Sequence, residues 1–574
     1  MANPIYEGSS QETSDSEESS VPVLTQKKPA IHCLKHLKKA SAIESDSAES
    51  QVTSQSDETS ETKRIKVSKQ AWRSRPKAKS KSKPSAPKEY ESSTQETSDC
   101  SNTMADQQTE IPKPASSGML DYCSWMVDQL SPEERESAAT NWWQTFAEFC
   151  GGMGTGIMCF EGLRRALAAH HLTVHAACAC VTEPVKWKSK ALKELLECLE
   201  EQTHPCPIFS RTGDLNNLVL TDFEEEVVLE KPTFHLLLQG IVCIDISSLT
   251  TTPKSVMDIE GQSGQSCREL ISYLDELRFE DRPGGIILEC VLRLSQKRKK
   301  GLLKPEVGTE LVSAGLRTVG YVGAWEQEDA LKAYLPQSRK RTWGLFLKVT
   351  ASGPNPLEAE RKRRDDVSAA FSIMKKLRVR RNEPLEVVVG RLGIAPGLAA
   401  ESEVTTQKHL HVNMDWATRG APQNSMKKLG LAPKDLLASE DLKAFWTAAG
   451  SLMSQSCRRH TLMRLCSLRK KGTLPDWREA VLAFNADESA YRLGVGITHF
   501  PCVQPQRLHI MALTGKMVKA DGKVCLAMQG IQSKELNAFP SLSKLTSRRQ
   551  QDLAGNAFTA NVCAAYILAL AVVR

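Results

Sequence analysis

The sequence lacks the features of a membrane or secreted protein. No apolar run among its 574 residues reaches the roughly 20 residues that span a bilayer. The longest such run, Val562–Val573, instead predicts a buried helix. The opening segment Met1–Ser50 is polar and acidic and shows no secretory hydrophobic stretch. We therefore expect an intracellular protein with no membrane contact.

Metal-binding cysteine patterns are also missing. The chain has 17 cysteines, but no CxxC motif is accompanied by the second CxxC or HxxxH motif that would complete a zinc site. We therefore expect no zinc site and no other metal site. The cysteines lie mainly in apolar stretches such as Ala176–Val181, which predicts reduced thiols. The sequence contains no internal repeat of solenoid period.

Large apolar side chains are scarce in residues 1–116. This segment is rich in Ser, Thr, Glu, Gln and Lys, so it cannot bury enough surface to offset its ordering entropy, and we predict a disordered tail. Within it, Lys63–Lys88 holds 11 Lys or Arg residues and no acid. This charge favours nuclear import and attraction to phosphate backbones, whereas a solvated linker is the alternative.

Strand and helix patterns alternate after residue 117. This alternation predicts an α/β fold with a doubly wound, mostly parallel sheet. The expected strands are Trp142–Phe149, Leu172–Val181, Leu236–Ile246, Gly285–Leu294 and Trp343–Val349. The expected helices are Gly156–His170, Trp187–Glu201, Ser266–Arg278, Glu306–Ala314 and a final apolar helix, Ser547–Val573.

The region Glu358–Ala490 has a different pattern, with basic helical runs such as Glu360–Arg381 and few strand alternations. It predicts a second, smaller domain over residues 351–505. The first domain would then comprise residues 117–350 and 506–574. Nine basic residues of this region are candidates for phosphate contacts, with a solvated helical face as the alternative. They are Arg361, Lys362, Arg363, Arg364, Lys375, Lys376, Arg378, Arg380 and Arg381.

A glycine-rich turn follows the first expected strand. Such a turn lets a ligand approach the backbone, and the next helix offers its N-terminal amides. The residues of the turn are Phe149, Cys150, Gly151, Gly152 and Gly154. Glu183, at the end of the second strand, suits two ribose hydroxyls, and Asp214 suits an adenine amine. Together these residues predict an adenosine cofactor, because no Lys follows the glycines as in a phosphate-binding loop. An ordinary turn and solvated acids are the alternative.

Other polar residues stand near the ends of the later strands. Cys243 follows one apolar strand and Glu289 lies within another, where a carboxylate must be paired or protonated. Arg339 and Arg341 are two residues apart at the start of a strand and point to one face, where they suit a phosphate or a carboxylate. Asn556 is expected near the N-terminus of the final helix. Taken singly, each also fits a structural role: a buried thiol, a surface acid, solvated charges or a helix cap.

The order of these motifs resembles that of the cytosine-C5 DNA methyltransferase family. Gln337–Arg341 matches the family's QxRxR pattern, and Gly555-Asn556-Ala557 is similar to its terminal GNA motif. Further segments resemble its cofactor loop (Phe149–Gly154), its PCQxFS loop (Val242–Ser247), its ENV motif (Leu288–Val291) and its LQGFP stretch (Ala527–Ile531). The resemblance spans about Trp142–Val349 and His509–Arg574. Four residues depart from the family pattern: Met153, Val242, Ile244 and Cys290.

The resemblance implies a function that uses S-adenosylmethionine. Cys243 would attack C6 of a flipped cytosine, and Glu289 would hydrogen-bond its N3 and amine. Arg339 would hold the base or orient the catalytic loop, and Arg341 would support the sugar-phosphate side. The cofactor would contact Phe149, Cys150, Gly151, Gly152, Gly154, Glu183, Asp214, Asn556 and Ala557. Residues 351–505 occupy the family's target-recognition position.

Two alternatives to a DNA methyltransferase remain open. One branch of the family methylates transfer RNA, so RNA is the alternative substrate. The four departures also fit a catalytically inactive protein that keeps the fold and binds nucleic acid. DNA as the partner and the nucleus as the location are the primary expectations.

Overall fold

The computed structural model describes most of the chain beyond residue 112. The described residues are 113–149, 152–174, 178–182, 187–188, 190–195, 208–211, 219–221, 226–228, 233–243, 246, 254–258, 261–297, 307–350, 355–381, 383–391, 420–436, 439–474, 476, 481–486, 494–505, 508–513 and 516–574. The predicted disordered tail therefore lies outside the described residues, except for its last four positions.

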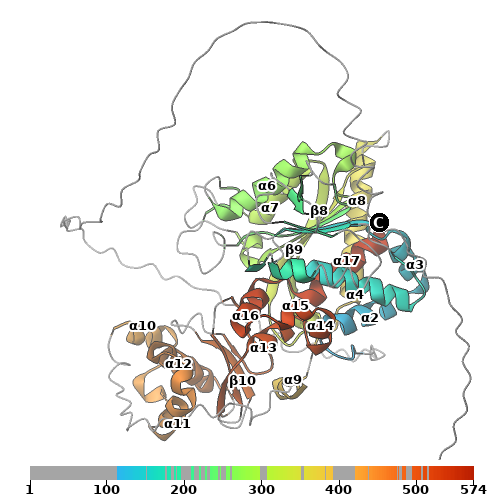
Figure 1. The fold of residues 1–574 in the computed structure, drawn as a ribbon. Helices are drawn as coiled ribbons and strands as arrows, with labels where there is room; N and C mark the ends of the chain where they lie inside the picture. The colour runs from blue at the N-terminus through green and yellow to red at the C-terminus, as the bar shows by residue number, and fades with distance from the viewer. Residues whose placement is uncertain are drawn as a thin grey trace, which may run out of the picture. The chain divides into compact units, whose positions relative to one another are not determined.

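A nine-stranded sheet forms the centre of the larger part of the fold (Figure 1), in the order β5-β4-β3-β2-β1-β6-β7-β9-β8. Its strands are β1 (Thr145–Phe149), β2 (Cys178–Thr182), β3 (Ile208–Arg211), β4 (Val219–Thr221), β5 (Glu226–Val228), β6 (Leu236–Gly240), β7 (Gly285–Val291), β8 (Tyr321–Asp329) and β9 (Lys340–Lys348). Strands β3, β2, β1, β6 and β7 are parallel to one another. Strand β9 runs antiparallel between β7 and β8, and β4 and β5 are antiparallel at the other edge. The predicted α/β class is confirmed, with a mixed sheet whose five central strands are parallel and whose pairings at both edges are antiparallel.

Both faces of this sheet are covered, because its central strands are apolar on both sides. Leu236 and Leu238 of β6 belong to one buried cluster, whereas Leu237 between them belongs to a second cluster on the opposite face. The first cluster includes residues of α2 (Met119–Gln129), α3 (Pro132–Thr140), α4 (Thr155–Ala169), α8 (Pro356–Lys376) and α17 (Ala560–Val573). The second includes residues of α6 (Gln262–Glu276) and α7 (Gly308–Thr318). Helices α6 and α7 lie across the sheet from α4 and α17 (Figure 1).

A second sheet has a hydrophobic core of its own. Its strand order is β11-β10-β12-β13, all antiparallel. Phe445, Trp446, Leu482, Phe484 and Ile510 are among the buried residues of that core. The elements are α10 (Gly420–Lys428), α11 (Ser439–Ala449), α12 (Gln455–Lys470), β10 (Val481–Ala486), β11 (Val495–Gly496), β12 (Leu508–Leu513) and β13 (Lys516–Lys519). Although β12 and β13 follow residue 505, they pair in this second sheet. The proposed domain boundaries stay a prediction.

Three local elements differ from the sequence expectations. The basic helix α8, expected in the second domain, packs on the first sheet through Val367, Ala370, Phe371 and Met374. Strand β8 was not expected, because the middle of this edge strand is only partly buried and has no clear apolar pattern. The final helix is broken into α16 (Ser547–Asn556) and α17.

The remaining helices are short and join these parts. They are α9 (Leu385–Arg391), α13 (Gly522–Ala527), α14 (Ser533–Ala538) and α15 (Pro540–Ser543). Within the described ranges, no single helix is long and apolar enough to cross a membrane; α16 and α17, bent by 43°, meet that test only as a pair.

Candidate active site

The predicted cofactor turn lies between β1 and α4. Gly152 and Gly154 adopt φ values of +67° and +74°, which favour glycine because they place the backbone in the left-handed region. A Cβ on Gly152 would lie 3.4 Å from the carbonyl oxygen of Asn556. The turn and the terminal motif, some 400 residues apart in the chain, are therefore neighbours in the structure. The side chain of Met153 between the glycines is buried in the core rather than in the turn's open face.

Only part of the predicted cofactor set can be placed. Cys150, Gly151, Glu183 and Asp214 lie outside the described residues. Phe149 is fully buried and packs edge-on against Tyr273, with ring centroids 5.8 Å apart, so its side chain belongs to the core.

A buried carboxylate beneath the turn was not predicted. Glu148 of β1 is fully buried, and its Oε2 accepts a hydrogen bond of 3.1 Å from the backbone N–H of Ile157 in the first turn of α4. The carboxylate therefore occupies a helix terminus where an anionic ligand would otherwise bind. The sequence does contain an indication of this carboxylate, because Glu148 is an acid inside an apolar strand directly before the glycines.

Cys243 and Glu289 lie at the carboxyl edge of neighbouring parallel strands. Gly240 of β6 is the register partner of Glu289 in β7, and the Ile241 N–H donates to the Glu289 carbonyl at 2.9 Å. Cys243 follows two residues later and is partly buried. Burial and the Glu289 carboxylate raise the pKa of the Cys243 thiol, while Arg341 and Arg339 act in the opposite direction. The side chains of the predicted nucleophile and acid are thus within electrostatic reach of one another.

Arg341 compensates the charge of Glu289. Its Nε lies 2.9 Å from Glu289 Oε1, and both side chains are largely buried, with exposures of 17% and 13%. The pairing follows from the register of β7 and β9, in which Arg341 faces Val291, two residues from Glu289. The Glu289 carboxylate, which lies within an apolar strand, is therefore paired with a cation. Pairing and protonation were the two alternatives that the sequence left open.

Arg339 connects three segments rather than facing an open site. Its guanidinium donates to the carbonyls of Val503 at 3.0 Å, Ala557 at 2.9 Å and Gly555 at 3.3–3.4 Å. Gln337 has a similar role, since its Nε2 donates to Met528 O at 2.6 Å and its Oε1 accepts from the Val503 N–H at 3.2 Å. Two residues of the QxRxR motif thus hold the loop 501–505 and the end of α16 against the first sheet.

Cys502 is a second thiol at this site that sequence reasoning missed. Its Sγ lies 3.7 Å from Arg339 Nη1 and 3.9 Å from Arg341 Nη2. Burial opposes ionisation of Cys502, but the two guanidinium groups outweigh it and hold the pKa of this thiol below its ordinary value. No local pattern around Cys502 indicated this, because both arginines, one just before β9 and one within it, come from more than 150 residues earlier in the chain.

The terminal motif lies at a helix C-terminus, not at the expected N-terminus. Asn556 is the last residue of α16, and its Nδ2 donates to the Asp552 carbonyl at 2.9 Å. Ala557 is buried, and its carbonyl accepts from Arg339. The earlier expectation failed because the apolar run after Thr559 was joined to α16.

Most of the nine basic candidates are paired with acids. Six of them form ion pairs: Arg363, Arg364, Lys375, Lys376, Arg378 and Arg381. Arg361 and Lys362 are exposed on α8. The pairing favours a solvated, ion-paired helical face for most of this set.

No family profile matches the sequence, and no curated protein matches it. Solved structures that match do so at low identity and low TM-score, as two of them show. The Dnmt2 methyltransferase of S. pombe is 12% identical, with a TM-score of 0.32, over 74% of this chain and 98% of that one. A mutant DNMT2 of Spodoptera frugiperda is 11% identical, with a TM-score of 0.33, over 74% of this chain and 99% of that one. Likenesses this weak add nothing to the case for the chemistry, which rests on the residues.

Proposed function

We propose that this protein is an S-adenosylmethionine-dependent methyltransferase that methylates C5 of cytosine in DNA. The observation that carries the proposal is the ion pair of Glu289 and Arg341 beside Cys243, at the carboxyl edge of a parallel sheet. Ligand sites of open α/β sheets form at this edge. The motif order of the sequence supports the assignment of cytosine as the substrate.

The three side chains have separate tasks. Cys243 attacks C6 of a cytosine flipped out of the duplex, forming a carbon–sulfur bond as the C5=C6 double bond opens. After C5 has taken the methyl group and lost its proton to a base, the carbon–sulfur bond breaks and the Cys243 thiol is released. Glu289 accepts a hydrogen bond from the exocyclic amine and shares a proton with N3, which stabilises the charge that develops on the ring. Arg341 keeps Glu289 in place and favours the thiolate of Cys243. Arg339 positions these residues by fixing the surrounding loops.

The residues around the turn fit the proposed cofactor. S-adenosylmethionine supplies the methyl group from a positively charged sulfonium. Glu148 already occupies the first turn of α4, which disfavours a phosphate there and favours a cation nearby. Gly152, Gly154 and Asn556 would lie against the cofactor, and Glu183 and Asp214 would hold its ribose and adenine.

We further propose that DNA is the partner and the nucleus the location. Both rest on the basic segment Lys63–Lys88 and on the resemblance in the motifs. RNA as the substrate and an inactive nucleic-acid-binding protein are outcomes that the following experiment distinguishes.

The test is transfer of a tritiated methyl group to cytosine-containing DNA and to transfer RNA. The unmodified protein should label DNA, and Cys243→Ser should abolish labelling while cofactor binding persists. Cys457→Ser, which removes a thiol from α12 in the second core, serves as the matched control and should retain activity. Labelling of transfer RNA alone would reassign the substrate.

A covalent trap separates an enzyme from an inactive relative. DNA containing 5-fluorocytosine should form a stable adduct with the unmodified protein but not with Cys243→Ser. If neither DNA nor RNA is labelled and no adduct forms, the inactive alternative is correct. Labelling by Cys243→Ser would instead disprove the assignment of the nucleophile.

A further inference from the structure

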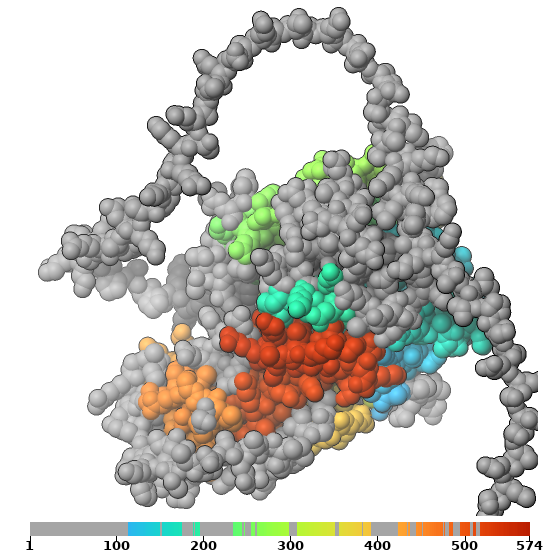
Figure 2. Space-filling model, in the orientation of Figure 1, coloured from blue at the N-terminus to red at the C-terminus, as the bar shows by residue number. Residues whose placement is uncertain are grey.

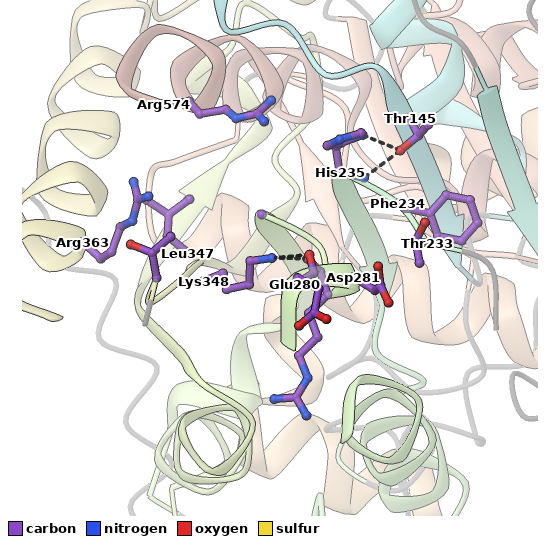
Figure 3. Close-up of a pocket in the computed structure, with 13 residues that line it drawn as sticks. Thr145, Thr233, Phe234, His235, Glu280, Asp281, Leu347, Lys348, Arg363 and Arg574 are labelled. Atoms are coloured by element: carbon purple, nitrogen blue, oxygen red, sulfur yellow. Dashed lines mark hydrogen bonds between the residues drawn. The ribbon is translucent and has the colours of Figure 1, made fainter. Parts of the chain in front are cut away.

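A cavity of about 340 Å³ (Figure 3) lies among the first sheet's strands, at their ends opposite the proposed active site. Thr145 begins β1, His235 precedes β6, and Gly284 precedes β7, so the cavity lies where the parallel strands start. Lys348, at the end of antiparallel β9, completes this edge. Cys243 and Glu289 lie beyond or near the other ends of β6 and β7. A ligand in the cavity would therefore not be the methylated base.

The wall of the cavity carries more positive than negative charge. Its permanent cations are Arg282, Lys348, Arg363 and Arg574, against the two acids Glu280 and Asp281. Both acids are already paired with Arg278, whose nitrogens lie 3.6 Å from Glu280 and 2.7 Å from Asp281. The cations facing the cavity are therefore only partly compensated by its own wall.

Two of the cations have donors left for a ligand. Arg363 uses Nη1 to pair with Asp366 at 3.0 Å, and Arg574 uses Nη1 for the Asn141 carbonyl at 3.4 Å while it stacks on Trp143. Within the described part of the chain, the Nε and Nη2 atoms of both guanidinium groups make no hydrogen bond. In Figure 3, Arg363, Arg574, Lys348 and His235 surround one open space.

Lys348 contributes charge rather than a free donor. Its Nζ donates to the carbonyls of Phe279, Glu280 and Arg282 at 2.8–3.2 Å, which fixes the ammonium group at the cavity wall. Carbonyl partners do not cancel its charge. A dianion in the cavity would do so.

The cations of the cavity wall also repel one another electrostatically. Burial, together with the nearby Arg363, lowers the pKa of Arg574. Burial, Arg574 and Lys348 lower the pKa of His235. Like charges held close together in a partly buried space are relieved by a bound anion.

We propose that this cavity binds the phosphate group of a small organic phosphate. The planar guanidinium groups of Arg363 and Arg574 match the oxygens of a phosphate. Thr145 and Thr350 line the same wall, where the Thr145 hydroxyl is hydrogen-bonded to His235. A volume of about 340 Å³ is at the small end of the usual range for ligand sites, which favours a small molecule. The inference does not depend on the proposed methyltransferase activity.

Isothermal titration calorimetry of the full chain with inorganic phosphate and with ribose 5-phosphate tests the proposal. Sodium acetate at matched ionic strength is the control anion. Both phosphates should bind saturably, and Arg363→Gln should weaken binding about tenfold or more, since charged hydrogen bonds are lost. Arg361→Gln, an exposed arginine on the same helix, is the matched control and should change little.

A second variant guards against misfolding. Arg574→Gln, at an exposed position after α17, should also weaken phosphate binding, and circular dichroism melting should show that both variants are folded. Absence of saturable binding, or equal binding by the Arg363→Gln and Arg361→Gln variants, would overturn the proposal. Displacement of bound phosphate by a single-stranded oligonucleotide would overturn the assignment to a small molecule.

Discussion

The two partly exposed thiols of the site face opposite electrostatic surroundings. Cys502 contacts two guanidinium groups, and these hold its pKa below the ordinary value, whereas burial and Glu289 raise the pKa of Cys243. We therefore expect iodoacetamide to alkylate Cys502 with a half-maximal rate below pH 9 and Cys243 above it. Mass spectrometry of peptides alkylated over pH 6–10 measures both profiles. An Arg341→Gln variant should move the Cys502 profile upward, and an unchanged profile would contradict the assigned cause.

Individual residues show what sequence reasoning can and cannot predict. The proximity of Cys243 and Glu289 could be predicted because each stands near the end of an apolar strand, while their catalytic roles stay a prediction. The task of Arg339 could not, because its carbonyl partners in Val503, Gly555 and Ala557 come from distant parts of the chain. Cys502 was missed for the same reason. Tertiary partners, rather than local sequence, decide what these side chains do.

At the scale of elements, the loop 501–505 packs tightly between the two sheets. A Cβ on Gly555 of α16 would lie 2.1 Å from the Pro505 nitrogen, a backbone atom that cannot move aside cheaply. We expect Gly555→Ala to lower the free energy of unfolding by roughly 2 kcal/mol or more. Gly390→Ala in α9, where a Cβ meets nothing within 4 Å, is the control and should be neutral or slightly stabilising. Urea denaturation measures the free energy of unfolding of both variants. Equal values would show that loop 501–505 does not pack tightly against Gly555.

A buried histidine anchors the strand that follows this loop. The side chain of His509 in β12 contacts Asn485 Oδ1 through Nδ1 and the backbone of Gln504 through Nε2. Burial lowers its pKa from 6.5 to about 4. Because the folded-state value is the lower one, the stability that neutral His509 contributes is complete above pH 6.5. It is lost as the pH falls toward 4, by roughly 3 kcal/mol in total.

Chemical denaturation at pH 7.5, 6, 5 and 4 tests this dependence. Replacing His509 with Gln should remove much of the loss on acidification, whereas replacing the exposed His171 with Gln should leave the profile as in the unmodified protein. A His509→Gln profile that parallels the unmodified protein would show that another group controls the acid response.

Among the elements, those with a clear apolar pattern could be predicted from the sequence. Strands β1, β6 and β7 are buried on both faces, so they stand out as apolar runs. Helix α8 was correctly predicted to be helical, but its packing on the first sheet was not, because its charge outweighs its four buried residues in the sequence. The break between α16 and α17 was hidden since apolar residues continue through Phe558.

At the scale of the whole molecule, we expect the proposed affinity for DNA to depend mainly on the basic segment Lys63–Lys88. Six of the nine basic candidates for phosphate contacts are ion-paired, whereas Lys63–Lys88 holds 11 cations and no acid in its sequence, so we expect this segment to make the larger contribution. Each phosphate that a cation neutralises releases counterions, which makes binding salt-dependent.

Replacing the 11 Lys and Arg residues of Lys63–Lys88 with Gln should therefore flatten the plot of log affinity against log salt by several units of slope. Fluorescence anisotropy with a labelled duplex at 50–300 mM salt measures that slope. Replacing Arg361 and Lys362 on α8 instead should change it by about two at most. If the α8 pair alone removes most of the salt dependence, DNA binding belongs to the folded domains and the tail acts as a linker.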